Sequence, residues 1–182
     1  MSRKILVIRG SARKYGYTNR LCDMIPEICE DSTVEYFDTY KTDIKPCTGC
    51  NYCESNGKCV YRDLDSFFES FENADIVVFA SPVFNGCFSS PIKSLIDRFQ
   101  VYYTNFYAGG KVQQIKKHRE AVLITAAGRK GEEATLYMKS QLECAFTILN
   151  MKMRNAVLCA YTDTEPDFER AKEELRRSLS DE

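Results

Sequence analysis

The chain has 182 residues, of which 44% are hydrophobic and 28% charged, and its formal net charge is −1. This length is enough for one domain with a sizeable core, so we expect a single domain over residues 1–182. The balanced charge gives no reason to expect a nucleic acid or a membrane surface as a partner. The N-terminal apolar run, Ile5–Ile8, is too short for a signal-peptide core or a membrane span, so a cytoplasmic protein is expected.

The first predicted strand is Lys4–Arg9, a short aliphatic run typical of a strand buried on both faces of a parallel sheet. It leads into the loop Gly10–Asn19, in which Thr18 or Asn19 is predicted to cap a helix. The second strand is predicted at Val34–Phe37, and a short connection then leads into a segment rich in cysteine.

Four cysteines fall within thirteen residues at the spacing C-x2-C-x2-C-x5-C, and they are Cys47, Cys50, Cys53 and Cys59. Two residues between cysteines let successive thiolates converge on one centre, as in loops that hold a cubic iron–sulfur cluster. Zinc sites more often use two separated cysteine pairs or add histidine, and a third possibility is a reduced, empty thiol loop. The spacing favours the cluster among these three alternatives.

The chain has nine cysteines in all, which raises the question of a disulfide-linked secreted protein. We expect reduced thiols in a reducing compartment, because no export signal is present and four of the cysteines stand at ligand spacing. Four others fall on apolar helix or strand positions and are predicted to lie in the core: Cys22, Cys29, Cys144 and Cys159.

After the cysteine loop, Asp63 is predicted to cap a helix that carries Leu64 and three phenylalanines at helical spacing. The third strand is predicted at Ile76–Ala80, followed by the loop Ser81–Ser89. Ser90 and Pro91 are typical of a helix start. The aromatic group Tyr102, Tyr103, Phe106 and Tyr107 exceeds what one buried stripe needs. It could pack internally, but we favour a subunit contact.

The C-terminal half continues the alternation. A strand is predicted at Ala121–Thr125, a helix over about Glu132–Leu149, a strand at Val157–Ala160, and a last helix that buries Phe168, Ala171, Leu175 and Leu179. His118, the only histidine, is predicted to be solvated together with Lys116, Lys117 and Arg119. The fold class is therefore α/β: a doubly wound, five-stranded parallel sheet of order 2-1-3-4-5 with helices on both faces.

In such a sheet a ligand binds at the carboxyl ends of strands one and three. The loop after strand one offers the hydroxyls of Ser11 and Thr18, the guanidinium of Arg13 and the amino end of a helix, a combination suited to a phosphate. It has neither the Gly-Lys-Ser/Thr of nucleoside-triphosphatases nor G-x-G-x-x-G, so the single phosphate of FMN fits better than a dinucleotide. An ordinary polar turn is the alternative.

The loop after strand three, S-P-V-F-N-G, offers backbone groups beside Phe84 that could lie along a flat heteroaromatic ring. Ala127 and Gly128, after strand four, would leave room for that ring. A plain strand-to-helix connection is the alternative. Cys87 follows this loop closely, and we favour a packing role for it over a place beside the flavin. The cysteine loop follows strand two, so a flavin in this crevice would be the partner of any cluster.

Four motifs together resemble the NADPH-dependent FMN reductase family: G-S-A-R-K-x-G-x-T-N, P-C-x-G-C-x-Y-C-x5-C, A-S-P-V-F-x-G and P-I-K-S-L-I-D-R. The cysteine loop resembles that of the iron–sulfur flavoproteins within the family. The resemblance is specific over Ile5–Phe99 and extends further only through the order of strands and helices. It implies a flavodoxin-like fold, non-covalent FMN, NAD(P)H as a possible co-substrate, and homodimers or homotetramers. It also implies a [4Fe-4S] cluster of one subunit that faces the FMN of another.

The resemblance assigns roles to matching positions. The phosphate end of FMN would be held by Ser11, Arg13, Thr18 and Asn19. The isoalloxazine would be lined by Pro82, Val83, Phe84, Asn85 and Gly86, with Ala127 and Gly128 closing over it. Cys47, Cys50, Cys53 and Cys59 would ligate iron. Ala12 and Tyr17 stand where relatives often have Pro and Asn, and Phe84 stands where Tyr is common; none of these changes removes a ligand.

Three functions remain open. The first is an iron–sulfur flavoprotein that exchanges electrons with a ferredoxin-like donor. The second is a clusterless NAD(P)H-dependent flavin or quinone reductase, and the third is a non-enzymatic, flavodoxin-like electron carrier. No Ser–His–Asp or paired-carboxylate arrangement points to hydrolysis, so no catalytic side chain is assigned and the flavin would carry the chemistry.

Overall fold

The computed structural model describes residues 2–109 and 114–180. Within these residues the chain forms a five-stranded sheet of order β2-β1-β3-β4-β5, with every neighbouring pair parallel. The strands are β1 (Arg3–Arg9), β2 (Ser32–Asp38), β3 (Ile76–Pro82), β4 (Arg119–Ala126) and β5 (Met151–Cys159). The predicted strand order and the flavodoxin-like fold are confirmed.

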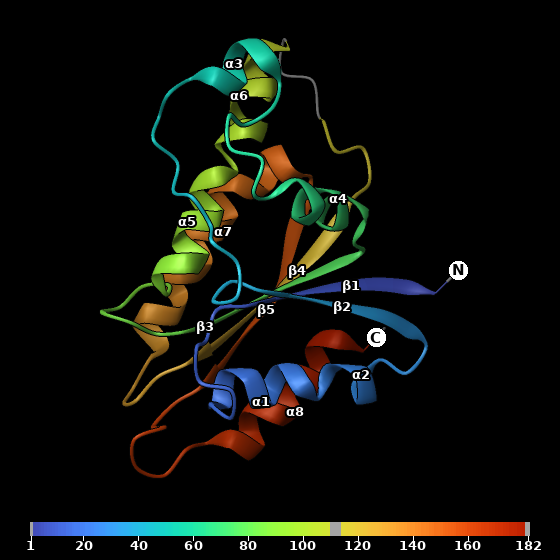
Figure 1. Cartoon of the computed structure of the whole chain (residues 1–182). Coiled ribbons are helices and arrows are strands. Elements are labelled where there is room, and N and C mark those ends of the chain that lie inside the picture. Colours follow the sequence, from blue (N-terminus) through green and yellow to red (C-terminus); the bar gives the residue numbers. More distant parts are fainter. Residues whose placement is uncertain (1, 110–113, 181–182) are drawn as a thin grey trace.

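Helices cover both faces of the sheet (Figure 1). One face carries α1 (Tyr17–Asp23), α2 (Ile25–Ile28) and α8 (Phe168–Leu179). The other carries α4 (Asp65–Asn73), α5 (Ser90–Arg98), α6 (Gln100–Ala108) and α7 (Glu132–Leu149). The short α3 (Tyr52–Asn56) belongs to the cysteine loop and lies against α6 (Figure 1).

The central strands β1, β3 and β4 carry continuous apolar runs because alternate residues enter two separate cores. Leu6 and Ile8 of β1 pack with the α4–α5–α7 side, whereas Ile5 and Val7 pack with the α1–α8 side. In β3 the same alternation places Val77 in the core on the α4–α5–α7 side and its neighbours Ile76 and Val78 in the core on the α1–α8 side. The pairing of β1 with β3 aligns Leu6 with Val77, so both enter the same core. Both faces are therefore buried, which explains why the sequence shows continuous apolar runs rather than polar alternation.

The range predicted for the fifth strand, Val157–Ala160, was too short. The strand begins at Met151, six residues before the predicted Val157, and it ends at Cys159 rather than Ala160. Its first half is partly exposed at the edge of the sheet, so Lys152–Ala156 carries no apolar run that the sequence pattern could have revealed.

Several predicted helix caps were also wrong. Gly16 precedes α1, so Thr18 and Asn19 lie inside its first turn, where both are buried. Leu64 precedes α4, and the Asp63 carboxylate instead contacts Arg98 and the backbone N–H of Lys45. At α5 the capping position is Ser89, one residue before the predicted Ser90.

Two predictions of burial were reversed. Cys144 was expected in the core and is exposed, because it stands on the outer side of α7. Arg119 was expected to be solvated and is 0% exposed; its guanidinium donates to the carbonyl oxygens of Phe71 and Leu149 at the ends of α4 and α7. Burial lowers the pKa of Arg119 to about 10. His118 is exposed, as are Lys116 and Lys117.

The other core cysteines, Cys22, Cys29 and Cys159, are buried as predicted. Burial raises the pKa of the Cys22 thiol to about 12, so this group packs as a neutral apolar side chain. Among the described helices, none is both long and apolar enough to cross a membrane.

Candidate functional site

A cavity of about 830 Å³ lies where the strands end, within the size range of small-molecule and cofactor sites. Loops that follow all five strands contribute to its wall, which accords with the rule that ligands bind at the carboxyl ends of parallel strands. Its lining residues are Ser11, Ala12, Arg13, Lys14, Tyr15, Gly16, Tyr17, Thr18, Tyr40, Pro82, Val83, Phe84, Ala126, Gly128, Thr162 and Asp163.

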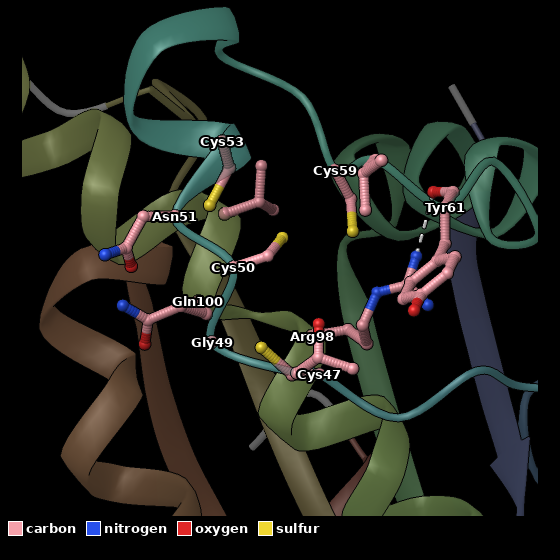
Figure 2. A pocket seen from close by; sticks show the side chains of 12 residues that line it. Cys47, Gly49, Cys50, Asn51, Cys53, Cys59, Tyr61, Arg98 and Gln100 are labelled. Carbon is pink, nitrogen blue, oxygen red and sulfur yellow. Dashed lines mark hydrogen bonds between the residues drawn. The ribbon is translucent and has the colours of Figure 1, made fainter.

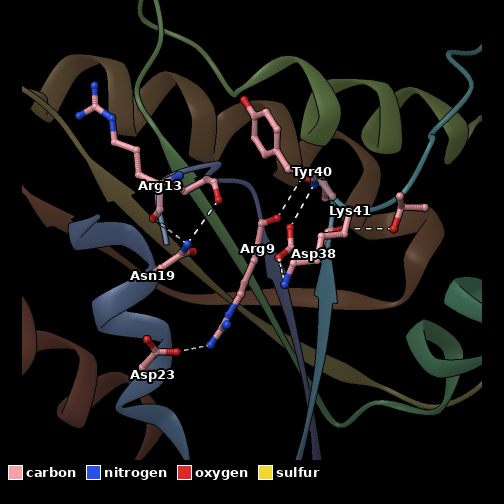
Figure 3. A network of polar contacts seen from close by, with 10 residues as sticks. Arg9, Arg13, Asn19, Asp23, Asp38, Tyr40 and Lys41 are labelled. Carbon is pink, nitrogen blue, oxygen red and sulfur yellow. Dashed lines mark hydrogen bonds and ion pairs between the residues drawn. The ribbon is translucent and has the colours of Figure 1, made fainter. Parts of the chain in front are cut away.

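The loop after β1 is held in shape by Asn19 (Figure 3). The Asn19 amide donates to the carbonyl oxygens of Ser11 at 3.3 Å and of Arg13 at 3.0 Å. Asn19 is 6% exposed and does not line the cavity, so it positions the loop from beneath. At the base of the loop, Arg9 forms an ion pair with Asp23 of α1 (Figure 3).

The loop after β3 folds into a tight turn. Phe84 and Cys87 exchange backbone hydrogen bonds, and the two residues between them, Asn85 and Gly86, have φ of 50° and 76°. The turn leaves the Phe84 side chain 51% exposed at the cavity wall. Asn85 and Gly86 themselves do not line the cavity.

A buried serine connects these two loops. The Ser89 hydroxyl donates to the Gly10 carbonyl at 2.8 Å, and its backbone N–H donates to the Ser81 hydroxyl at 3.0 Å. Ser89 is 0% exposed. Gly10 has no room for a side chain, because a Cβ there would stand 2.2 Å from Ile92 Cδ1 and 2.8 Å from the Ala80 oxygen. Ser89 therefore links the loop after β1 to the loop after β3.

The loops after β4 and β5 form the opposite wall. Backbone N–H groups of Thr162 and Asp163 donate to the carbonyl oxygens of Ala127 and Gly128 at 3.0 and 3.2 Å. The Asp163 carboxylate fills the space above Gly128, where a Cβ would stand 2.2 Å from Asp163 Oδ2. Ala127 is buried and does not line the cavity; its C=O accepts the Thr162 N–H, and its own N–H donates to the Cys159 carbonyl at 2.9 Å.

Of the eleven residues predicted to bind the cofactor, the structure brings seven together at the cavity: Ser11, Arg13, Thr18, Pro82, Val83, Phe84 and Gly128. The remaining four do not line it: Asn19 and Ala127 are buried, and Asn85 and Gly86 are exposed in the turn after Phe84. Sequence reasoning missed Tyr40, Thr162 and Asp163. They follow β2 and β5, so the strand-end rule could have found them had it been applied beyond the two central strands. Cys87 also stays outside the wall, and its sulfur lies 3.6 Å from the amide nitrogen of Gln141 on α7.

A second cavity is lined by all four cysteines of the loop, as Figure 2 shows. Cys47 and Cys50 are exposed, and Cys53 and Cys59 are half-buried. Gly49, Asn51 and Gly57 have φ of 64°, 56° and 65°, left-handed conformations that turn the backbone around the cavity. In residues 2–109 and 114–180, no three His, Cys, Asp or Glu side chains are grouped closely enough to hold a single metal ion. The thiols surround the cavity instead of meeting at one point.

The wall of the cysteine cavity includes Arg98, the last residue of α5 (Figure 2). Arg98 is 1% exposed and forms a two-pronged ion pair with Asp63, at 2.9 Å from Nη2 to Oδ1 and 3.1 Å from Nη1 to Oδ2. Burial alone would raise the pKa of the Asp63 carboxyl, but hydrogen bonds from Arg98 and the Lys45 N–H outweigh it and hold that pKa below its usual value. This role could not be predicted from the sequence pattern, because Arg98 lies far from the cysteines along the chain.

Helix α6 supports the same loop. The Thr104 hydroxyl lies 3.2 Å from the Cys53 sulfur, and the Asn105 amide donates to the Gly57 carbonyl at 2.9 Å. In the aromatic group, Tyr102 is buried and its hydroxyl donates to Glu72 at 2.8 Å, whereas Tyr103 and Tyr107 are 47% and 51% exposed. One face of α6 thus holds the cysteine loop while two tyrosines remain at the surface.

The two cavities are separate within one chain. They share no lining residue, and Figure 1 shows α3 and α6 at the end of the molecule opposite the loop that precedes α1.

Comparisons with known proteins identify the family of the chain and related folds. The profile of the family described as NADPH-dependent FMN reductase matches residues 3–163. An iron–sulfur flavoprotein of Methanocaldococcus jannaschii is 31% identical over 136 residues, which are 73% of this chain and 67% of that protein. An iron–sulfur flavoprotein of Archaeoglobus fulgidus is 32% identical over 143 residues, 77% of this chain and 62% of that protein. The chain therefore spans about two thirds of the length of these relatives.

Two further similarities carry other names. An NAD(P)H:quinone oxidoreductase of Solanum tuberosum is 35% identical over 96 residues, 52% of this chain and 48% of that protein. The solved structure of an NAD(P)H:quinone oxidoreductase from Methanothermobacter marburgensis superimposes with a TM-score of 0.72 at 16% identity, covering 100% of this chain and 98% of that one. At that identity the structural similarity concerns the fold alone.

Proposed function

Because the chain belongs to the NADPH-dependent FMN reductase family and is a flavin-dependent oxidoreductase, we propose that it is an iron–sulfur flavoprotein. In this proposal FMN occupies the cavity at the strand ends, and a [4Fe-4S] cluster occupies the cysteine loop. The observation that carries the cluster part is that four cysteines at C-x2-C-x2-C-x5-C spacing line one cavity.

The residues of the strand-end cavity fit FMN. Ser11, Thr18 and Arg13 supply hydroxyls and a positive charge for a phosphate. Phe84 and Pro82 supply an apolar surface against which a flat ring can lie, and Gly128 has no side chain, which lets the Asp163 carboxylate lie against it at the opposite wall. When bound, FMN supplies the redox chemistry, since a flavin can exchange electrons singly or in pairs.

The chain's own residues have binding and orienting roles in this proposal. Asn19 holds the phosphate loop in shape, and Ser89 holds that loop against the ring loop, so the two ends of the cofactor are positioned together. Phe84, half-exposed at the wall, provides a surface beside which a nicotinamide could stack for hydride delivery. No side chain needs to act as a nucleophile or proton donor for these roles.

The cysteine cavity also fits its group. Four thiols are the usual ligand set of a cubic cluster, and the buried Nε of Arg98 has no hydrogen-bond partner among the described residues. A thiolate-bound cluster is an anion that such a donor would stabilise. The cluster supplies one-electron transfer, which would let the protein connect a ferredoxin-like donor with the flavin.

We propose a homodimer or homotetramer as the working assembly. The separation of the two cavities within one chain supports this, because short-range transfer would need the cysteine loop of one subunit to face the flavin cavity of another. The exposed Tyr103 and Tyr107 beside the cysteine loop are suited to such a contact.

The decisive experiment is anaerobic purification followed by an absorption spectrum and counts of FMN, iron, zinc and acid-labile sulfide. We expect FMN, iron and sulfide, with iron lost in Cys50→Ser and retained in Cys144→Ser. Cys144 is the matched control because it is an exposed cysteine outside the loop. FMN without iron or sulfide would contradict the cluster, and zinc in its place would identify a zinc site. A protein that takes up no FMN would overturn the proposal entirely.

The second candidate is a clusterless NAD(P)H-dependent flavin or quinone reductase, favoured by the similarity to the Solanum tuberosum protein of that name. It predicts steady-state NAD(P)H oxidation that is unaffected by Cys50→Ser. A flavodoxin-like carrier would instead show no turnover with any common acceptor.

A further inference from the structure

The cysteine loop is closed at its base by one side chain. Arg98 donates through Nη1 to the Lys45 carbonyl at 2.7 Å and through Nη2 to the Tyr61 carbonyl at 3.0 Å. Lys45 stands two residues before the first cysteine of the loop, and Tyr61 stands two residues after the last. A single guanidinium therefore joins the segment that enters the loop to the segment that leaves it, and these two segments are called the legs of the loop below.

Asp63 also holds the base of the loop. Its carboxylate accepts hydrogen bonds from Nη1 and Nη2 of Arg98, and Oδ2 also accepts the Lys45 N–H at 2.9 Å. The leg that enters the loop is therefore bound by both Arg98 and Asp63. The Arg98 side chain is fully buried and that of Asp63 is 18% exposed, which shields this pair from solvent. Arg98 also lies over the Tyr61 ring, 5.5 Å from Cζ to the ring centroid.

One hydrogen-bond donor of the Arg98 guanidinium, Nε, has no acceptor within the described protein. This nitrogen is buried, an arrangement that costs free energy unless a ligand satisfies it. Figure 2 shows the Cys59 sulfur directed toward the guanidinium, and this cysteine acts electrostatically on it. The unsatisfied donor thus faces the cavity that the four cysteines line.

We propose that Arg98 is the positioning residue of the cysteine site: its guanidinium clamps the two legs of the loop, and its Nε donates toward the sulfur of Cys59 when a cluster is held. The second half of this inference rests on the proposed function. The clamp preorganises the loop, because the entropy of bringing the legs together is lost when the protein folds rather than when the cluster assembles. The donor stabilises negative charge at a ligand sulfur, one of the factors that set cluster potentials.

Three variants distinguish the closure of the loop by Arg98 from the effect of its positive charge. Arg98→Lys keeps a positive charge but cannot reach both carbonyls and the carboxylate at once. The double variant Arg98→Met with Asp63→Asn removes the pair without leaving a buried unpaired carboxylate. Arg62→Met is the control, because Arg62 is an exposed arginine next to Asp63 in the chain, pairs with Asp65 at 2.6 Å, and takes no part in the contacts of Arg98.

Two readouts are made on each variant. The first is hydrogen exchange of the peptide spanning residues 45–63 in iron-free, reduced protein. The second is the iron content and midpoint potential of protein reconstituted anaerobically with iron and sulfide. We expect exchange at least tenfold faster, on the order of what loss of a local closure gives, in both Arg98 variants and unchanged exchange in Arg62→Met. We expect a more negative midpoint potential, or loss of iron, in the double variant, and a smaller change in Arg98→Lys.

Each half of the proposal is contradicted by a different result. Wild-type exchange in both Arg98 variants would overturn the clamp, and full iron at the wild-type potential in the double variant would overturn the role toward the cluster. If the wild-type protein itself assembles no cluster, the proposed function fails, and the clamp is then decided by the exchange measurement alone. Should the double variant not fold, Arg98→Lys provides the same test with the charge retained.

Discussion

At the scale of single residues, the two buried arginines show how differently one side chain can be accommodated. Arg98 is paired with a carboxylate, whereas Arg119 donates to two backbone carbonyls and lies over the Phe71 ring at 4.5 Å. The carbonyls of Phe71 and Leu149 belong to helix ends, where intrahelical donors are lacking. Arg119 thus satisfies groups that would otherwise be buried without a partner.

Replacement of Arg119 with Met should therefore lower the free energy of unfolding by about 3 kcal/mol, because two buried carbonyls lose their donor. Urea unfolding followed by circular dichroism measures this. Lys116→Met, an exposed neighbour, should change the free energy by less than about 0.5 kcal/mol. Equal effects of the two substitutions would show that the Arg119 contacts contribute nothing.

The Asp75 carboxylate provides a test that depends on pH. It pairs with Lys117 at 2.5 Å and accepts the Lys4 N–H at 2.7 Å. Burial works to raise the pKa of Asp75, but these hydrogen bonds outweigh it and lower that pKa. A carboxyl with a lowered folded pKa stabilises the protein above its unfolded value of about 3.9, and this stabilisation is lost as the pH falls through the folded value.

Asp75→Asn should accordingly be less stable than wild type at neutral pH, and the difference should shrink as the pH falls below about 4. Urea unfolding at neutral and acidic pH measures the difference. Asp31→Asn, a change to an exposed aspartate in the loop before β2, is the control. A difference that stays constant with pH would mean that the charge of Asp75 is not involved.

At the scale of elements, the loops after the five strands act together because short contacts connect them. Ser89 joins the loop after β1 to the start of α5, and the pairing of Thr162 and Asp163 with Ala127 and Gly128 joins the loops after β4 and β5. Residues that never touch the cavity can therefore determine its shape.

Ser89→Ala should weaken FMN binding about fivefold, the equivalent of ~1 kcal/mol for one lost hydrogen bond. Titration of apoprotein with FMN, followed by flavin fluorescence, gives the dissociation constant. Ser90→Ala is the matched control, since this serine is exposed at the start of α5. An unchanged constant in Ser89→Ala would show that the two loops are positioned independently.

Gly128→Ala should weaken FMN binding by about tenfold or more, because its Cβ would displace the Asp163 carboxylate toward the cavity. In the double variant with Asp163→Ala the conflict is removed, so part of the affinity should return. The same fluorescence titration applied to both single variants and the double variant measures the coupling. Additive losses would exclude this steric explanation.

At the scale of the whole molecule, the two cavities lie in different parts of the folded subunit. The proposed electron transfer between cluster and flavin therefore depends on the assembly of subunits. The Tyr103 and Tyr107 rings contact each other in a tilted arrangement, with centroids 4.7 Å apart, on the surface of α6 next to the helix that carries Cys53. This places an exposed aromatic surface where a second subunit would have to approach.

The double variant Tyr103→Glu with Tyr107→Glu should shift the protein toward monomers, because charge would be buried in an apolar contact. Sedimentation velocity measures the assembly, and electron transfer from the cluster to FMN should slow in parallel. Tyr137→Glu, which changes an exposed tyrosine of α7, is the control. An oligomer that survives both substitutions would place the interface elsewhere.

The sequence by itself determined the sheet, its strand order and the two central ligand loops. Strands buried on both faces are apolar along most of their length, and the glycine and serine residues that follow them are visible locally, so these features can be predicted without knowledge of distant contacts. The cysteine spacing was visible for the same reason. The extent of β5 was not, because the partly exposed half of an edge strand carries no apolar signal.

Only the tertiary structure decided which polar residues are buried and which loops meet. Arg119 lies in a charged segment and Cys144 in an apolar one, yet the arginine is buried and the cysteine exposed, because helix packing determines which side of each element faces the core. Tyr40, Thr162 and Asp163 reach the cavity through the closing together of distant strand ends. Arg98 reaches the cysteine loop in the same way, from a helix that starts beyond β3. These contacts join residues far apart in the chain, so their partners become known only once the sheet has brought them together.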